Sequence, residues 1–443
     1  MAVLAINGGS RLIPAEMEQK WPPVGQEQID AVMEVLESGV FWGPYEKQVS
    51  ALEQEVCDYL GVKHALVLNS GTAALHACVS ACDIRPGDEV ITTAFSFWAT
   101  AQAIVAQNGI PVFVDVDPKT FNIDPSKIEE KITDRTKAIL PVHVHGIPAD
   151  MDAINAIARK YNLKVIEDAA QAFGATYKGR KAGTLGDMAA FSLNGTKNLP
   201  AGEGGIVVTD DDELFNRARQ MAMFGEEKTR KGAIRLYDAK IMGFNYRNNE
   251  MSDALCRSYL RNYDNMQAQR YENCAYLTKE LSKIKGVKPL VPPADVQSAY
   301  HLYKVLFYPE ELGITDIHPL RFKWAVEKAL CAEGASCYTW HIMPIPGEEI
   351  FRRKDAYGNG APWSFDCVSQ QSRDMVYDPY DYPVAMDMFD RSMIIKPVYY
   401  PNKVELMEQI VAAFHKVFDN LDELLEFAKV VEFPLMPGEV RNI

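Results

Sequence analysis

Long apolar runs and clusters of basic residues are both missing from this chain of 443 residues. No stretch of about 18 or more apolar residues occurs, so the sequence predicts no membrane-spanning helix. The first residues lack the positive region and the apolar core of a signal peptide, and we expect a cytoplasmic protein. Acidic residues outnumber basic ones by 60 to 46, and the resulting net charge of −14 argues against nucleic-acid binding.

Cysteine is scarce and scattered, which favours neither a disulfide framework nor a zinc site. Cys78 and Cys82 share a helix face, but no second pair or histidine follows at zinc-finger spacing. His143 and His145 alternate with valine, so on a strand they would share one face. We interpret them as hydrogen-bonded residues at a strand end, with a place beside a cofactor as the alternative. We therefore expect no metal site and mostly buried thiols in a reducing compartment: Cys57, Cys78, Cys82, Cys256, Cys274, Cys331, Cys337 and Cys367.

The order of apolar segments predicts an α/β fold. Between residues 44 and 209, short strands alternate with helices, as in the βαβ units of a mostly parallel sheet. We expect a large domain over 1–251 and a smaller α/β domain over 252–443, entered by a long helix at 252–284. The irregular segment 347–390 is interpreted as a functional loop or lid. Within the smaller domain we expect a strand at 301–308 and helices at 321–333 and 403–420.

Lys197 lies in an unusual setting for a lysine. The apolar strand Met188–Phe191 leads to Ser192, a polar turn presents Lys197, and a glycine-rich hairpin precedes a second strand at Ile206–Thr209. Enclosure between apolar strands lowers the pKa of an amine and frees it as a nucleophile for a carbonyl cofactor. A lysine in a surface loop is the alternative interpretation of this segment alone.

Asp168 follows the short buried strand at Val165–Ile166. An ionised carboxylate at the tip of a core strand is costly unless a positive group meets it. The protonated ring nitrogen of pyridoxal 5′-phosphate is such a group, and the aspartate then makes the ring an electron sink. A helix N-cap is the alternative role for Asp168, but its occurrence together with the Lys197 segment favours the cofactor.

An anion site is predicted after the strand at His64–Leu68. Ser70, Gly71 and Thr72 precede an alanine-rich helix, whose free N–H groups favour an anion at its N-terminus. The Gly-Lys-Ser/Thr ending of a Walker A loop is missing, and no Gly-x-Gly-x-x-Gly follows a strand, which argues against a nicotinamide site. We therefore assign this turn to the phosphate of the cofactor.

In this order and spacing, the three segments resemble the DegT/StrS family of sugar aminotransferases. That family has the three-layer fold of the aspartate aminotransferase type, with a large, mostly parallel sheet domain and a smaller C-terminal α/β domain. The resemblance extends over nearly the whole chain through these further segments: Phe41–Tyr45, Leu52–Leu60, Gly87–Ile91, Pro111–Val116, Pro141–Gly146, Asp150–Asp152, Gly243–Arg247 and Asp381–Ala385.

The resemblance implies a role for each candidate residue. Lys197 would form the Schiff base with pyridoxal 5′-phosphate and shuttle a proton, and Asp168 would pair with the ring nitrogen. The other implied contacts are Ser70, Gly71, Thr72 and Ser192 at the phosphate, Gln171 near the ring hydroxyl, Phe97 stacked on the ring (with Phe95 or Trp98 as alternatives), and Asn245 reaching the phosphate from a neighbouring subunit. The active site of a homodimer would thus be shared between subunits.

The implied reaction is transfer of an amino group from L-glutamate or L-glutamine to a keto sugar or keto cyclitol. It would proceed in ping-pong fashion through pyridoxamine 5′-phosphate, in amino sugar or antibiotic biosynthesis. The long C-terminal half favours a cyclitol or unusual sugar. Ile147 and Met343–Gly347 depart from the family pattern, which leaves Tyr338, Trp340 and His341 as candidate substrate contacts by composition, or as core. Dehydration or aminohydroxybenzoate-like chemistry, and a regulatory protein on the same fold, are the alternatives.

Overall fold

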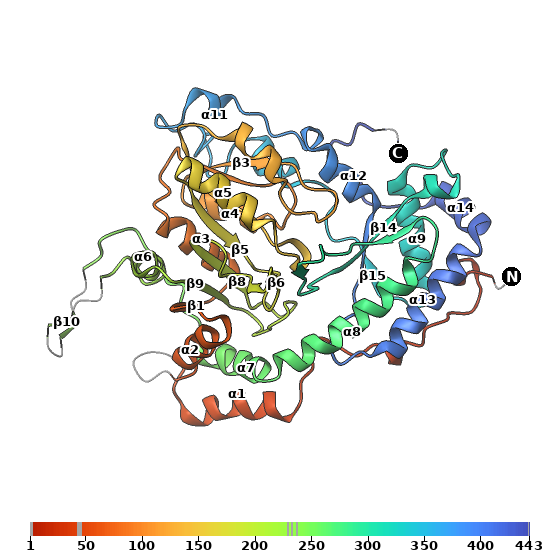
Figure 1. Ribbon diagram of the computed structural model, residues 1–443, viewed down its shortest axis with the longest axis horizontal. Helices are drawn as coiled ribbons and strands as arrows, with labels where there is room; N and C mark the ends of the chain where they lie inside the picture. Colours follow the sequence, from red (N-terminus) through yellow and green to blue (C-terminus); the bar gives the residue numbers. More distant parts are fainter. Residues whose placement is uncertain (1–2, 42–46, 228–229, 232–233, 236–237, 442) are drawn as a thin grey trace.

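The computed structural model consists of two bodies that lie side by side and are linked by a helix (Figure 1). Of the segment 41–45 that contributes to the family resemblance, residues 42–45 lie outside the described part of the chain. That part comprises residues 3–41, 47–227, 230–231, 234–235, 238–441 and 443.

A seven-stranded sheet forms the centre of the first body, in the order β1-β9-β8-β5-β4-β2-β3. Neighbouring strands from β8 to β3 are parallel, whereas β9 runs antiparallel to both of its neighbours. This sheet confirms the predicted α/β fold class. Its strands are β1 (His64–Leu68), β2 (Glu89–Thr93), β3 (Ile110–Val114), β4 (Thr136–Leu140), β5 (Lys164–Asp168), β8 (Met188–Ser192) and β9 (Gly205–Thr209).

Helices cover both faces of this sheet and make three layers. In β1, Ala65 and Val67 contact the core on one face, and Leu66 and Leu68 contact the core on the other, because side chains alternate along a strand. One face is covered by α3 (Gly71–Ala81), α4 (Ala99–Ala106) and α6 (Asp212–Ala222). The other face is covered by α2 (Gln48–Leu60), α5 (Met151–Tyr161) and α7 (Glu250–Leu260), with α1 (Gln26–Ser38) packed on α7.

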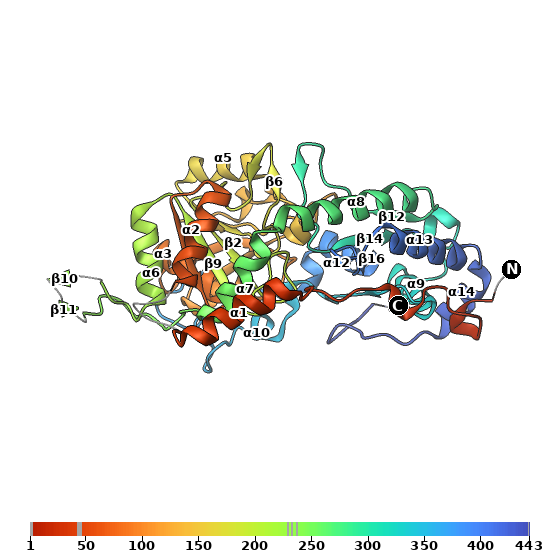
Figure 2. The same ribbon diagram turned by 90° about the horizontal axis from the view of Figure 1, so that it is seen from below.

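The second body is built on a four-stranded antiparallel sheet in the order β12-β14-β16-β15. Leu4 and Ile13 also belong to its core, because the N-terminal segment runs alongside this body before reaching α1 (Figures 1 and 2). The domain division at 251/252 stays a prediction. The elements are β12 (Val287–Pro289), β14 (Tyr303–Phe307), β15 (Cys337–Tyr338), β16 (Ser392–Ile395), α9 (Pro319–Glu333), α13 (Val404–Phe418) and α14 (Leu421–Val430), of which α14 was not expected from the sequence.

The prediction of one continuous helix at 252–284 is wrong, because the structure has two helices there. The chain forms α7 (Glu250–Leu260) and then α8 (Tyr263–Leu281), with Asn262 outside helical geometry at φ −110° and ψ 11°. The two helices pack on different cores: Tyr259 lies in the core of the large sheet, and Leu277 lies in the core of the second body. The break redirects the chain from one body to the other.

The segment 347–390 packs on the large sheet. Phe351 and Tyr377 meet the ring of Phe113 edge-on, and Trp363 joins the same apolar cluster. No residue of this segment lines either of the two described cavities that contain Lys197, so the lid interpretation is wrong for those cavities. A role as another kind of functional loop stays a prediction. Its helices are α10 (Glu349–Arg352), α11 (Gln370–Asp374) and α12 (Pro383–Arg391).

The remaining elements are short. A three-stranded sheet contains β13 (Val296–Gln297), β6 (Thr176–Tyr177) and β7 (Arg180–Lys181), and a separate hairpin contains β10 (Arg230–Lys231) and β11 (Ile234–Arg235). The 3₁₀ helices are Ala5–Asn7, Ala15–Met17, Pro125–Lys127, Glu129–Lys131, Val144–Gly146, Pro309–Leu312, Ile345–Gly347 and Pro379–Asp381.

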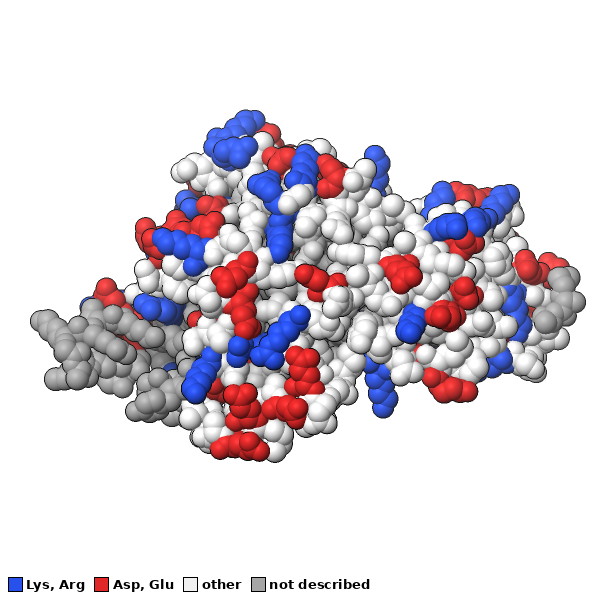
Figure 3. Space-filling view, turned by 60° about the horizontal axis from the view of Figure 1, so that its bottom comes forward, with Lys and Arg blue, Asp and Glu red and all other residues white. Residues whose placement is uncertain are grey.

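Charged side chains of both signs are interspersed on the face shown in Figure 3. No helix in the described part of the chain has the length and apolarity needed to cross a membrane. The eight cysteines are free thiols. Most are buried or half-buried as expected, but Cys331 and Cys367 are exposed.

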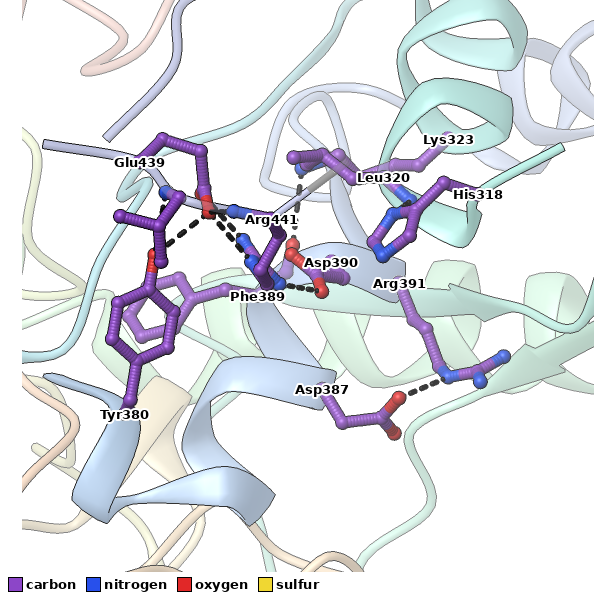
Figure 4. Close-up of polar contacts among 11 residues, drawn as sticks. His318, Leu320, Lys323, Tyr380, Asp387, Phe389, Asp390, Arg391, Glu439 and Arg441 are labelled. Atoms are coloured by element: carbon purple, nitrogen blue, oxygen red, sulfur yellow. Dashed lines mark hydrogen bonds and ion pairs between the residues drawn. The ribbon is translucent and has the colours of Figure 1, made fainter. Parts of the chain in front are cut away.

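The C-terminal tail is anchored to α12 by a cluster of polar contacts (Figure 4). Arg441 forms ion pairs with Asp390, which is buried, and with Glu439. Hydrogen bonds from Arg441, together with one from the hydroxyl of Tyr380, lower the pKa of Glu439 to about 2. On the other side of Asp390, the amine of Lys323 donates a hydrogen bond to the carbonyl of Phe389 at 3.0 Å. The tail thus supplies the charge that balances a buried carboxylate.

Arg441→Ala is expected to lower the free energy of unfolding by about 1–3 kcal/mol, because buried Asp390 would lose its cationic partner. Urea unfolding at neutral pH measures this change. Arg353→Ala is the matched control: its ion pair with Glu349 is exposed, and such pairs add little to stability. Equal effects of the two substitutions would contradict the anchoring role.

Candidate active site

Lys197 lines a cavity of about 360 Å³ at the carboxyl ends of the central strands. It lies in the hairpin between β8 and β9, and its amine makes no hydrogen bond or ion pair within the described residues. Burial lowers the pKa of Lys197 to about 8, while the charges of Asp168 and Glu203 oppose that shift. The amine is therefore partly neutral near neutral pH and free to act as a nucleophile.

Asp168 ends β5 and is 3% exposed. Its carboxylate accepts hydrogen bonds from the hydroxyl of Thr100 at 2.6 Å and from the backbone N–H of Ala170 at 3.1 Å. Burial raises its pKa, and these bonds and the charge of Lys197 oppose the rise. No helix starts after Asp168, so the N-cap alternative is wrong. Within the described residues no cation forms an ion pair with it, which leaves room for a cationic ligand group.

Two glycines allow the turn after β1 to approach the neighbouring strands. A Cβ on Gly71 would lie 2.7 Å from Cβ of Ser192, and a Cβ on Gly205 would lie 2.2 Å from the carbonyl oxygen of Ser70. Ser70 caps α3 by accepting a hydrogen bond from the N–H of Ala73 at 3.1 Å. The first turn of α3 has no acidic residue, so its N-terminus is suited to an anion.

Phe97 presents an aromatic face to the cavity. It is 41% exposed, and its ring lies parallel to that of Trp340, with an interplanar angle of 5° and centroids 6.1 Å apart. Phe95 is 1% exposed and stacks on Phe389 in the core, and Trp98 does not line the cavity. Of the three aromatic residues considered from the sequence, Phe97 is placed to contact a ligand.

Eight of the nine predicted site residues line this one cavity: Ser70, Gly71, Thr72, Phe97, Asp168, Gln171, Ser192 and Lys197. The amide oxygen of Gln171 accepts a hydrogen bond from the N–H of His145 at 2.8 Å, which leaves its amide nitrogen as a donor. Asn245 is the exception. It is exposed, does not line the cavity, and its role across a subunit boundary stays a prediction.

A second cavity of about 390 Å³ shares Thr196, Lys197 and Trp340 with the first. Tyr338 also lines it, whereas His341 lines neither cavity. The sequence reasoning assigned no role to several residues around the two cavities. Asn194, Thr196 and Glu203 lie within the Lys197 segment, where the lysine alone was singled out. The others are single polar residues outside a motif, which carry no local signal: Thr100, Arg270, His301 and Lys396.

The structure does not place the two candidate histidines, His143 and His145, on a strand. β4 ends at Leu140, and His143 forms a hydrogen bond with Glu167 at 2.8 Å, as expected for a hydrogen-bonded residue at a strand end. His145 has a positive φ of 59°, is 1% exposed, and neither of its ring nitrogens has a hydrogen-bond partner. The expectation of a hydrogen-bonded residue at a strand end is therefore wrong for His145.

Comparison with known proteins relates this geometry to a family. Residues 22–325 match the DegT/DnrJ/EryC1/StrS aminotransferase family. The chain belongs to this family, and it is an aminotransferase. The expected DegT/StrS resemblance and the aspartate aminotransferase type of fold are confirmed.

Relatives match the DegT/StrS-type aminotransferase over nearly its full length. A putative L-glutamine:3-amino-2,3-dideoxy-scyllo-inosose aminotransferase of Streptoalloteichus tenebrarius is 35% identical, over 95% of this chain and 99% of the relative. The spore coat polysaccharide biosynthesis protein SpsC of Bacillus subtilis is 33% identical, over 90% and 97%. The X-ray structure of the aminotransferase from Psychrobacter cryohalolentis is 29% identical with a TM-score of 0.76, over 91% and 100%.

The segments that depart from the DegT/StrS pattern lie away from both cavities. Ile147 is 2% exposed in an apolar core, and the N–H of Ile345 donates to the carbonyl of Ala94 at 2.9 Å. Within the described cavities, neither contacts the space beside Lys197. These departures therefore do not alter the lining of the lysine site.

Gly205→Ala is expected to destabilise the fold by about 1–3 kcal/mol and to prevent uptake of pyridoxal 5′-phosphate, because the added methyl group collides with backbone atoms of Ser70. Thermal unfolding and visible absorption measure the two effects. The control for stability is Gly195→Ala, since a Cβ there meets its nearest atom at an ordinary 3.7 Å. Normal cofactor uptake by Gly205→Ala would contradict the predicted role of this contact.

The reaction of Lys197 with pyridoxal 5′-phosphate is expected to accelerate as pH rises toward about 8 and to level off above that value. The neutral amine is the reactive form, and below its pKa the neutral fraction falls about tenfold per pH unit. Stopped-flow absorption of cofactor-free protein measures this rate, with Lys197→Ala as the blank. A rate that still rises steeply at pH 10, as for an ordinary lysine, would contradict the lowered pKa.

Proposed function

We propose that this aminotransferase moves an amino group from L-glutamine or L-glutamate to a keto cyclitol or keto sugar. The observation that carries the proposal is the presence of Lys197 and Asp168 in one cavity, beside a helix N-terminus suited to an anion. The family implies pyridoxal 5′-phosphate as the cofactor.

The residues fit that cofactor in their chemistry. A buried carboxylate without a cationic partner, a flat exposed aromatic ring and a glycine-lined helix end match its ring nitrogen, its ring face and its phosphate. We propose that Asp168, Phe97 and Gly71 make these three contacts, with Ser70, Thr72, Gln171 and Ser192 completing the site. When bound, the cofactor supplies an electron sink for the carbon that carries the amino group.

Each proposed role follows from a property of the residue. Lys197 has an amine that is free to bind a carbonyl carbon and afterwards to carry a proton at Nζ, since its pKa of about 8 lies near the operating pH. Thr100 and the N–H of Ala170 hold the carboxylate of Asp168 in one orientation. Trp340 lines both cavities beside Lys197, and we propose that its ring restricts water around the amine.

The substrate class is proposed from the relatives together with the length of the chain. The Streptoalloteichus relative is named for an inosose, which is a keto cyclitol, and it matches 433 residues. SpsC, named for polysaccharide biosynthesis, matches 406 residues. The match to the cyclitol enzyme thus extends further along the chain and supports a keto cyclitol, with a keto sugar as the second candidate.

We further propose that the donor and the keto acceptor use the Lys197 cavity in turn, in a ping-pong sequence, and that the enzyme is a homodimer. The exposed side chain of Asn245 supports a contact with a second subunit. The cytoplasmic location expected from the sequence stays a prediction.

The decisive experiment records the visible absorption of the protein loaded with pyridoxal 5′-phosphate before and after addition of L-glutamine or L-glutamate. We expect a yellow band that converts to the absorption of pyridoxamine 5′-phosphate, and that a keto cyclitol such as scyllo-inosose then restores. Lys197→Ala is expected to lose turnover, because no other amine is free at that position.

Three outcomes would contradict the proposal in different ways. Protein that takes up no cofactor would favour a regulatory role on the same fold. A yellow band that neither donor converts would favour dehydration or aromatisation chemistry. Undiminished multiple turnover by Lys197→Ala would remove the lysine from the mechanism.

A further inference from the structure

The second cavity beside Lys197 has a different character from the first. Its lining comes from the N-terminal segment, from the hairpin between β8 and β9, and from α8 and the second body, so the two bodies together enclose the space next to the lysine. The residues that give it its polarity are Trp21, Arg270, His301, Tyr338, Lys396 and Tyr399.

Arg270 is a buried cation without a counter-ion. It lies on α8, is 5% exposed, and no carboxylate of the described residues forms an ion pair with it. Its Nη1 donates one long hydrogen bond, 3.4 Å, to the carbonyl of Tyr300. On the preceding helix, Arg257 pairs with Glu55 at 2.6 Å, as a partly buried arginine normally does. An unpaired buried charge is costly unless a ligand supplies the opposite charge.

The same cavity also contains buried polar nitrogens that have no hydrogen-bond partner within the described residues. Nε of Arg270 and Nε1 of Trp21 are N–H donors, and both are buried without a partner in the described structure. Nδ1 of His301 also has no partner. A ligand that satisfies these groups must bring oxygen acceptors and negative charge.

The ring of Trp21 helps to orient the guanidinium group. The Cζ atom of Arg270 lies 5.2 Å from the centroid of the Trp21 ring, within the range of a cation–π contact. Arg270 and Lys197 both lie close enough to His301 for their charges to lower its pKa, after the larger effect of burial. All three side chains line this cavity.

We propose that Arg270 binds the α-carboxylate of the amino-acid donor. This inference rests on the proposed function, because it requires an amino acid as substrate. A carboxylate is planar and accepts two parallel hydrogen bonds from a guanidinium group, and it neutralises the buried charge. It is also bonded to the carbon that carries the amino group, and Arg270 and Lys197 line the same cavity, so we expect one amino acid to engage both residues.

A neutral acceptor would use the same space in a different way. A keto cyclitol has hydroxyl groups but no charge, so it offers acceptors to Trp21 and Arg270 without neutralising the guanidinium group. The donor is thus held more strongly by charge than the acceptor is. A phosphate group of a nucleotide-linked sugar is the competing anion, and the test below separates it from the carboxylate.

The test compares L-glutamine with L-glutaminamide, in which a neutral amide replaces the α-carboxylate. The readout is the rate at which each compound converts the yellow cofactor-loaded protein to its pyridoxamine form. We expect wild type to prefer L-glutamine by roughly 10²-fold in kcat/KM, as for a lost charge-assisted bidentate contact. Arg270→Gln is expected to lose that preference by slowing L-glutamine while leaving L-glutaminamide nearly unchanged, and Arg270→Lys is expected to restore part of it.

Lys396→Gln is the matched control, since Lys396 is the other cation that lines this cavity outside Lys197, and its side chain is 55% exposed. It is expected to keep the preference for L-glutamine. Loss of the preference in Lys396→Gln but not in Arg270→Gln would overturn the inference.

The substrate comparison in wild type needs no mutation, so it remains decisive even if Arg270→Gln folds poorly. A wild type converted equally fast by both compounds would overturn the role of Arg270, while the aminotransferase function would stand. A wild type converted by neither compound would instead reject the proposed donor reaction. Competition by UDP that disappears in Arg270→Gln, with an unchanged preference for L-glutamine, would assign Arg270 to an acceptor phosphate and overturn the inference.

Discussion

The close contact between the turn after β1 and the strand β9 is the constraint on which the candidate site depends. Gly205 and Gly71 leave no room for a Cβ, so the backbone of Ser70 comes against β9 and the start of α3 comes against Ser192. Because Ser192 and Lys197 belong to the same hairpin, this contact fixes the distance between the N-terminus of α3 and the lysine. A larger side chain at either glycine would separate them.

The second principle of the site is the placement of unbalanced charges. Asp168, Lys197 and Arg270 are buried or half-buried, have no ion-pair partner within the described residues, and line two connected cavities. In the second body, by contrast, the buried carboxylate of Asp390 is balanced by Arg441. The stability lost at such unbalanced groups is recovered when ligands supply the missing partners.

Much of the first cavity could be predicted from sequence, because its residues sit at the ends of strands. A lysine in a glycine-rich hairpin, an aspartate after β5 and a Ser-Gly-Thr turn after β1 are local patterns, and parallel strands bring their carboxyl ends to one edge. The choice of Phe97 over Phe95 required the structure, because two aromatic residues two positions apart look alike until burial separates them. The helix break at Asn262 was also hidden, since no glycine or proline marks it in the segment 260–266.

The sequence by itself therefore determined the fold class, the enclosed position of Lys197 and most of the residues that line its cavity, because each depends on residues that are near in the chain. Only the tertiary structure decided that the segment 347–390 packs into the core, that Thr100 holds Asp168, and that Arg270 meets Trp21 beside Lys197. Trp21 and Arg270 are 249 positions apart, and their contact follows from the packing of the N-terminal segment against α8, which no local pattern encodes.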